Sequence, residues 1–149
     1  MYEIDLSTLL LIGINDVSTK VVTTDNEFIV NMSSKSIMQN SCKYFGSSLT
    51  NRIRETNILT NMTSKTPIFV EETRNIIFFP LRSCRESNNI WISYNNLENY
   101  YKEGKKTILE FKKGKKIILD FSYYIVDNQV TRSLVLDYQL NKRRKSLEK

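Results

Sequence analysis

The most constraining feature of the sequence is an apolar helical stripe that ends at a single glycine. Met38, Cys42 and Phe45 are spaced i, i+4 and i+7, which places them on one face of a helix. Gly46 follows at the position where a helix ends in a left-handed residue, a conformation that glycine tolerates best. The pattern predicts a helix over residues 34–45 that buries its apolar face and stops abruptly.

A second helix is predicted immediately after this stop. Ser47 or Ser48 can cap a helix over about residues 49–59, which carries Arg52 and Arg54. Two helices meeting at a sharp corner can present basic residues to a partner. The same corner can also simply close a small core, with Arg52 paired to an acid such as Glu55, and the sequence leaves both alternatives open.

Short apolar and β-branched runs separated by turn residues predict strands and hairpins elsewhere in the chain. Paired runs predict three hairpins, and two further runs predict single strands. The hairpins are 21–23 with 28–30, 67–70 with 76–79, and 107–111 with 116–121; the single strands are 9–12 and 90–92.

Two more helices complete the predicted fold. Residues 94–101 fit a helix that Gly104 stops, and Ser122 can cap a long helix that runs to about residue 140. Tyr123, Val126, Val130 and Leu134 are predicted to lie on the buried face of this last helix. The fold class is therefore α+β, with antiparallel hairpins, two short central helices and a long C-terminal helix. We expect one domain over residues 1–141 and a frayed basic tail over 142–149.

Charge is distributed unevenly along the chain. The net charge is +6 and the isoelectric point is about 9.3, which favours an anionic partner. Residues 1–32 contain one basic and five acidic residues, whereas residues 33–149 contain 21 basic and 11 acidic residues. The surface that meets an anionic partner is therefore expected in the later part of the chain.

The composition argues against several classes of enzyme and membrane protein. There is no histidine, which removes the usual general base and the commonest zinc ligand, and two cysteines cannot form a metal cage. The acidic residues show no clustered spacing for a magnesium-dependent nuclease, so we expect neither enzymatic activity nor a cofactor. No apolar run is long enough to span a membrane, and a reduced, cytoplasmic protein is expected.

The third predicted hairpin carries the highest density of positive charge. Its six lysines fall within twelve residues, with Glu110 as the opposing acid; they are Lys105, Lys106, Lys112, Lys113, Lys115 and Lys116. With Gly114 at the bend, the hairpin is predicted to form a positive ridge that can approach a nucleic-acid groove. The alternative is a solvated hairpin whose lysines protect an edge strand from aggregation.

Several short blocks, taken in order, resemble the competence transcription factor family of Gram-positive bacteria, ComK. They span roughly residues 20–135 and follow the order found in the family. The blocks are Phe28-Ile29-Val30-Asn31-Met32; Ser41-Cys42 through Phe45-Gly46-Ser47-Ser48 to Arg52; Lys65-Thr66-Pro67-Ile68; Ile77-Phe78-Phe79-Pro80; Trp91-Ile92-Ser93; and Ser122-Tyr123 with Asn128-Gln129 and Arg132.

The resemblance implies a sequence-specific DNA-binding activator of the genes for DNA uptake. Members of the family recognise paired A/T-rich boxes largely through the minor groove, and act as homodimers that pair into tetramers on bent DNA. RNA polymerase is a further candidate partner. Family members commonly continue into a C-terminal segment that an adaptor recognises for proteolysis. This chain stops soon after Lys145, which puts adaptor control through such a segment in doubt.

The resemblance also points to particular residues. It includes Gly114 with Lys115, and it includes Arg52, while Arg54 and the other five lysines rest on charge alone. Asn128, Gln129 and Arg132 lie at i, i+1 and i+4 of the last helix, roughly away from its apolar face, where they can contact DNA. A structural role for these three, at a dimer interface or against loops, is an equal alternative.

Other functions are compatible with the same composition. Eight tyrosines permit a single-stranded nucleic-acid or RNA binder in which exposed rings stack on bases. A protein-interaction module whose charge only aids solubility is another alternative.

Overall fold

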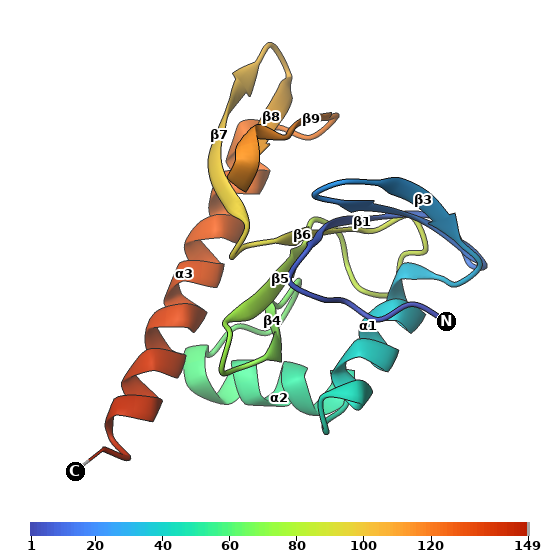
Figure 1. Ribbon diagram of the computed structural model, residues 1–149. Coiled ribbons are helices and arrows are strands. Elements are labelled where there is room, and N and C mark those ends of the chain that lie inside the picture. The colour runs from blue at the N-terminus through green and yellow to red at the C-terminus, as the bar shows by residue number, and fades with distance from the viewer. Residues whose placement is uncertain (149) are drawn as a thin grey trace.

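The computed structural model describes residues 1–148 and shows a mixed α+β fold, which confirms the predicted class (Figure 1). The elements in chain order are β1 (Thr8–Asn15), β2 (Ser18–Thr23), β3 (Glu27–Val30), α1 (Ser34–Tyr44), α2 (Leu49–Thr60), β4 (Ile68–Glu71), β5 (Ile76–Pro80), β6 (Ile90–Ser93), β7 (Leu97–Glu103), β8 (Lys106–Phe111), a 3₁₀ turn η1 (Lys112–Gly114), β9 (Lys116–Leu119) and α3 (Tyr123–Lys145). The three predicted hairpins and both single strands are confirmed.

The strands form two antiparallel sheets. The large sheet has the order β3-β2-β1-β6-β5-β4, and the small sheet has the order β7-β8-β9. Leu10 of β1 lies opposite Val22 of β2 on one side and Ile92 of β6 on the other. The pairing of β1 with β6 therefore joins the first hairpin to strands some 80 residues later in the chain and makes one continuous sheet.

The large sheet is covered on both faces, because successive residues of its strands point to opposite sides. On one face, Leu11, Val21 and Trp91 pack with Ile37 and Met38 of α1. On the other face, a second cluster joins the sheet to β8 and α3; it contains Leu10, Val22, Phe79, Ile92, Leu109, Phe111 and Val126. The small sheet and α3 therefore lie on the opposite side of the large sheet from α1.

The predicted helical corner is confirmed. Ser33 accepts a hydrogen bond from the Ser36 amide at the start of α1, and Ser48 accepts one from Asn51 at the start of α2, both at 3.1 Å. Gly46 has a φ of +87° between them, the left-handed conformation for which glycine was expected. Met38 and Cys42 are fully buried in the core on this side of the sheet.

The predicted helix over residues 94–101 is wrong, because β7 occupies most of this segment. Tyr100 pairs with Leu109 and Lys102 with Thr107 across the β7–β8 ladder. Asn96 forms the turn before β7 and donates to the main-chain oxygens of Leu6 and Thr8. These long-range hydrogen bonds outweigh the local helical pattern.

The long C-terminal helix α3 is confirmed, and its details differ from the prediction in two respects. Leu134 was expected on the buried face but is 55 % exposed, while Leu136 and Leu140 are fully buried. The helix also continues through Lys145, where a frayed tail was expected from residue 142. Its last turns are held because Arg143 donates to the Glu72 carboxylate at 2.8 Å. None of the helices within residues 1–148 is both long and apolar enough to cross a bilayer.

Candidate nucleic-acid interface

The lysines gather on the small sheet, which projects from one end of the molecule beside the start of α3 (Figure 1). Residues 97–119 contain seven lysines and three glutamates. The prediction that the lysines form a single positive ridge is nevertheless wrong, because strand β8 separates them into two groups. The five residue steps along β8 correspond to about 17 Å, so each group is described separately.

The first group, the hairpin-tip cluster, surrounds the β7–β8 turn. It consists of Lys102, Lys105 and Lys106, all exposed, together with Tyr124 at the start of α3, which is 66 % exposed. Lys102 Nζ donates to the Tyr124 hydroxyl at 2.7 Å and lies 4.4 Å from the centroid of the Tyr124 ring. The cluster therefore combines exposed ammonium groups with an aromatic face, a combination suited to phosphates and bases.

A shallow groove opens within this cluster. Its volume is about 330 Å³, and Lys102, Lys105 and Tyr124 line it together with Tyr123 and Ser122. The rings of Tyr123 and Tyr124 meet edge to face at 5.7 Å, which fixes their relative orientation.

The second group, the turn cluster, surrounds η1 at the other end of β8. Lys112 and Lys113 are exposed, and Lys113 and Gly114 both have positive φ values, +69° and +84°. Lys115 is partly buried, and its Nζ donates to the Thr23 carbonyl at 3.0 Å. Lys115 therefore ties the turn to the large sheet, while Lys112 and Lys113 remain exposed.

Lys116 belongs to the same turn but is partly neutralised. Its Nζ lies 3.6 Å from the Glu110 carboxylate on the neighbouring strand. In contrast, Lys105, Lys106, Lys112 and Lys113 form no ion pair within residues 1–148. Together with Lys102, which is exposed and also forms no ion pair there, these four lysines are the uncompensated positive charges of the small sheet and its turns.

The two arginines of α2 have different environments. Arg52 is bonded to Glu55 at 3.2 Å and its guanidinium lies 4.4 Å from the centroid of the Phe69 ring, with only 13 % of its side chain exposed. The ion pair with Glu55 is the structural role that the sequence left open for Arg52 as an alternative to contact with a partner. Arg54 is exposed and reaches Asn51 of its own helix at 3.4 Å. Of the two, Arg54 retains a solvent-facing guanidinium.

The expectation that Gln129 lies away from the buried face of α3 is wrong. Gln129 is fully buried, and its Nε2 donates to the carbonyls of Lys65 and Pro80 at 2.8 and 2.6 Å. Arg132 donates to the same Lys65 carbonyl and to that of Ser64, and burial lowers the pKa of its guanidinium. These two side chains hold the α2–β4 loop against α3.

Asn128, immediately before Gln129 in the sequence, is exposed and takes no part in this network. It is the member of the predicted trio that remains accessible to an outside partner.

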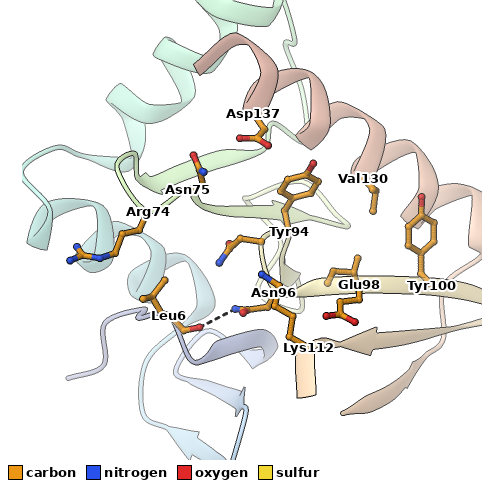
Figure 2. A pocket seen from close by; sticks show the side chains of 12 residues that line it. Leu6, Arg74, Asn75, Tyr94, Asn96, Glu98, Tyr100, Lys112, Val130 and Asp137 are labelled. Atoms are coloured by element: carbon orange, nitrogen blue, oxygen red, sulfur yellow. Dashed lines mark hydrogen bonds between the residues drawn. The ribbon is translucent and has the colours of Figure 1, made fainter. Parts of the chain in front are cut away.

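A hollow lies at the base of the small sheet, between α3 and the β4–β5 turn (Figure 2). It has a volume of about 570 Å³, and its lining carries both signs of charge, from Arg74 and Lys112 and from Glu98 and Asp137. Burial raises the pKa of the Asp137 carboxyl. In Figure 2 the Asn96 side chain turns to the Leu6 carbonyl, so part of the polar lining is already engaged in holding the fold.

Within residues 1–148 there is no cluster of three metal-ligating side chains. Burial raises the pKa of the Cys42 thiol to about 11, which keeps this residue protonated and unreactive.

Sequence reasoning missed Lys102 and Tyr124. Both were hidden by the wrong helix prediction for residues 94–101, since only strand β7 brings Lys102 beside the start of α3. The available signal was the Tyr123-Tyr124 pair after the Ser122 cap, because adjacent residues of a helix point about 100° apart and the predicted buried face included only Tyr123.

Comparisons with known proteins agree with the resemblance found in the sequence. The family model described as "ComK protein" matches residues 1–145. A relative named "Competence transcription factor" from Bacillus subtilis (strain 168) is 30 % identical over 118 residues, which cover 78 % of this chain and 62 % of the relative. The match thus spans less than two thirds of that relative's length. No solved structure matches the chain. The family match, which covers nearly all of the residues described above, shows that the chain belongs to the ComK protein family.

Proposed function

We propose that this chain is a transcription factor that binds double-stranded DNA and activates genes for DNA uptake. The observation that carries the proposal is the set of uncompensated, exposed lysines at both ends of β8, in a member of a family whose matched relative is named a competence transcription factor. Such a protein works in the cytoplasm at the nucleoid and needs no chemical step, which agrees with the absence of histidine from the sequence.

The proposed mode of binding is insertion of lysines into the minor groove of A/T-rich boxes. A-tracts have a narrow minor groove with a strongly negative potential, which attracts lysine without a base-specific pattern of donors. The η1 turn is only three residues long and has Gly114 at its bend, so its Lys112 and Lys113 can approach the groove floor closely. The hairpin-tip cluster then contacts phosphates about 17 Å away along β8.

Arg54 and Asn128 are proposed as secondary contacts because both are exposed. Arg52, Gln129, Arg132 and Lys115 are proposed to stabilise the fold rather than to contact DNA, since their polar groups are already bonded within the chain. Two copies on paired boxes, assembling to a tetramer and contacting RNA polymerase, complete the proposal.

The salt dependence of DNA binding tests the proposal. Each lysine that neutralises a phosphate contributes about 0.9 to the slope of log K against log salt. Replacing Lys112 and Lys113 with alanine should therefore lower the slope by about 1.8 for each bound protomer, and the Lys105→Ala, Lys106→Ala variant should show a similar loss. The matched control replaces Lys35 and Lys43, which are exposed on α1 on the opposite side of the large sheet. That control should retain the wild-type slope.

The binding test should compare DNA duplexes of different base composition, with the minor groove either open or blocked. We expect tight binding to paired A/T-tracts, much weaker binding to GC duplexes of equal length, and loss of footprint with a minor-groove blocking agent. Equal, salt-insensitive binding to both duplexes would refute the proposed function.

The exposure of Tyr124 supports a second candidate function, binding of single-stranded nucleic acid or RNA. A ring that is 66 % exposed beside Lys102 can stack on an unpaired base. Preference for a single strand over the A/T duplex in competition, abolished by Tyr124→Ala, would favour this alternative.

A further inference from the structure

The large sheet has one protected edge and one open edge. At β4, the residues from Ile68 to Val70 are fully buried, and α1 and α2 pack against that strand. At the other edge, residues 27–29 of β3 are exposed (blue in Figure 1). Open edges offer unpaired backbone groups to another strand, and proteins usually block them with lysine, proline or a covering segment. The β3 strand, Glu27-Phe28-Ile29-Val30, contains neither lysine nor proline.

The hydrogen-bonding pattern identifies which backbone groups of β3 face outward. The Thr23 amide donates to the Asn26 carbonyl at 2.8 Å, so these residues form a hydrogen-bonded pair. Bonded and non-bonded pairs alternate along an antiparallel ladder, which makes Phe28 and Val30 the next residues to bond with β2. The N–H and C=O groups of Glu27 and Ile29 therefore point away from β2, toward the open side of the edge.

The side chains on this edge are apolar. Ile29 is 64 % exposed and Phe28 is 38 % exposed. Phe28 packs edge to face against Tyr2 on the α1 side of the sheet, where Val30 also contacts the core. When such a strand pairs with another strand, its outward backbone groups gain hydrogen-bond partners and its exposed apolar side chains become buried.

We propose that β3 pairs antiparallel with β3 of a second copy of this chain, with the two Ile29 residues directly opposite each other. This register makes the central Ile29 pair a hydrogen-bonded one and places Glu27 opposite Asn31 as the next bonded pair on each side. Phe28 then lies opposite Val30, an aromatic with a β-branched residue, and the Glu27 carboxylate meets an amide rather than another acid.

The neighbouring registers are less complementary. Centring the pair on Phe28 places Glu27 opposite Ile29, and centring it on Val30 places Ile29 opposite Asn31. In both of these registers, a polar side chain of one copy lies opposite an isoleucine of the other copy on the same face of the sheet. In the Ile29-centred register apolar side chains oppose apolar ones and Glu27, whose charge Lys20 of the same chain already balances at 2.9 Å, opposes an amide; this self-complementary match is the reason for choosing a second copy as the occupant of this edge.

This arrangement deepens the proposed function, on which its relevance to DNA rests. Residues that oppose each other across the two β3 strands lie on the same face of the joined sheet. The two-fold axis of the dimer therefore runs perpendicular to that sheet, and the small sheets of both copies project from the same side of it. The antiparallel pairing sends the two β2–β3 turns to opposite ends of the joined strands. Because Lys115 is bonded to Thr23 beside that turn, the two turn clusters lie on one side of the dimer and flank its axis. That is the geometry required to contact two boxes on one duplex.

The test uses the full chain and two changes at Ile29. Ile29→Pro removes the outward N–H but no bond to β2, and Ile29→Lys places two charges opposite each other. Light scattering and sedimentation should show the wild type as a dimer and both variants as monomers at the same concentration. The dimer dissociation constant of Ile29→Pro should rise about 30-fold, as expected for losing the two central hydrogen bonds. The control is Val17→Lys, at a 69 % exposed position in the β1–β2 turn, and it should remain dimeric.

A second measurement locates the interface without relying on lost stability. A cysteine placed at position 29 in a Cys84→Ser background should be cross-linked to its copy by a short bismaleimide, whereas a cysteine at position 17 should not. A dimer that persists in both Ile29 variants, or cross-linking at position 17 alone, would overturn the β3 proposal. A monomeric wild type would overturn it equally.

DNA titrations separate this proposal from the proposed function. If both hold, the Ile29 variants bind a single A/T box with the wild-type salt slope but lose cooperativity on paired boxes. If wild-type dimers form through β3 but no A/T duplex is bound, the DNA-binding proposal fails while the interface stands. If DNA binding is cooperative in the Ile29 variants, the interface fails while the function stands.

Discussion

Gln129 provides the sharpest test of how α3 is held in the fold. Its amide donates to the carbonyls of Lys65 and Pro80, and its Oε1 accepts a hydrogen bond from Arg132 at 2.7 Å. Replacing it with methionine keeps the length of the side chain and removes all three hydrogen bonds. Both carbonyls lose a donor, although the Lys65 carbonyl keeps the one from Arg132.

The expected cost of Gln129→Met is about 2–4 kcal/mol of unfolding free energy, because buried polar groups lose their partners. For a chain of this size the melting temperature should fall by roughly 4–16 °C. Urea unfolding followed by the fluorescence of Trp91, which is buried and the single tryptophan, measures the change.

The matched control is Asn128→Ala at the adjacent exposed position, which should change stability by less than about 0.5 kcal/mol. Well below its melting temperature, Gln129→Met should also bind DNA as tightly as the wild type, since Gln129 has no exposed surface. A variant with unchanged stability and weakened DNA binding would refute this reasoning and return Gln129 to the interface.

Two further predictions concern stability. Burial raises the pKa of the Asp137 carboxyl above its unfolded value, so folding favours the protonated form, and this contribution to stability is lost as the pH rises through the folded pKa. Asp137→Asn should therefore raise the melting temperature at pH 7 and have little effect below the unfolded pKa of about 3.9; a lower melting temperature at pH 7 would contradict the assigned cause. Gly13→Ala should destabilise the protein by about 1–3 kcal/mol, because a Cβ there overlaps the Ser87 carbonyl and crowds that of Asn89. Gly46→Ala is the comparison: its Cβ meets open space, so its cost should be limited to the backbone conformation, about 1 kcal/mol, and an equal cost for both variants would argue against the close approach at Gly13.

Local signals predicted most of the elements correctly. The stop at Gly46 and the serine that follows it were readable because a helix end depends on the few residues that form it. The hairpins were readable because alternation and turn residues are also local. The failure at residues 94–101 has the opposite origin, since β7 is held by its ladder to β8 and by contacts of Asn96 with the first strand.

The candidate interface was only partly predictable for the same reason. Charge counting located the lysines, but their accessibility depends on partners far away in the sequence. Lys115 is engaged by Thr23, 92 residues away, and Gln129 by Lys65, 64 residues away. Sequence proximity to Lys113 or Asn128 gave no indication of either contact.

By itself, the sequence determined the α+β class, the helical corner, the hairpins and the basic character of the later part of the chain, because these follow from short-range periodicity, capping and composition. Only the tertiary structure decided which cations remain free, how β8 divides the lysines, that Gln129 is internal, and that β3 is an open edge. These features depend on which segments meet across the two sheets, and burial and hydrogen bonding between distant residues have no local signature.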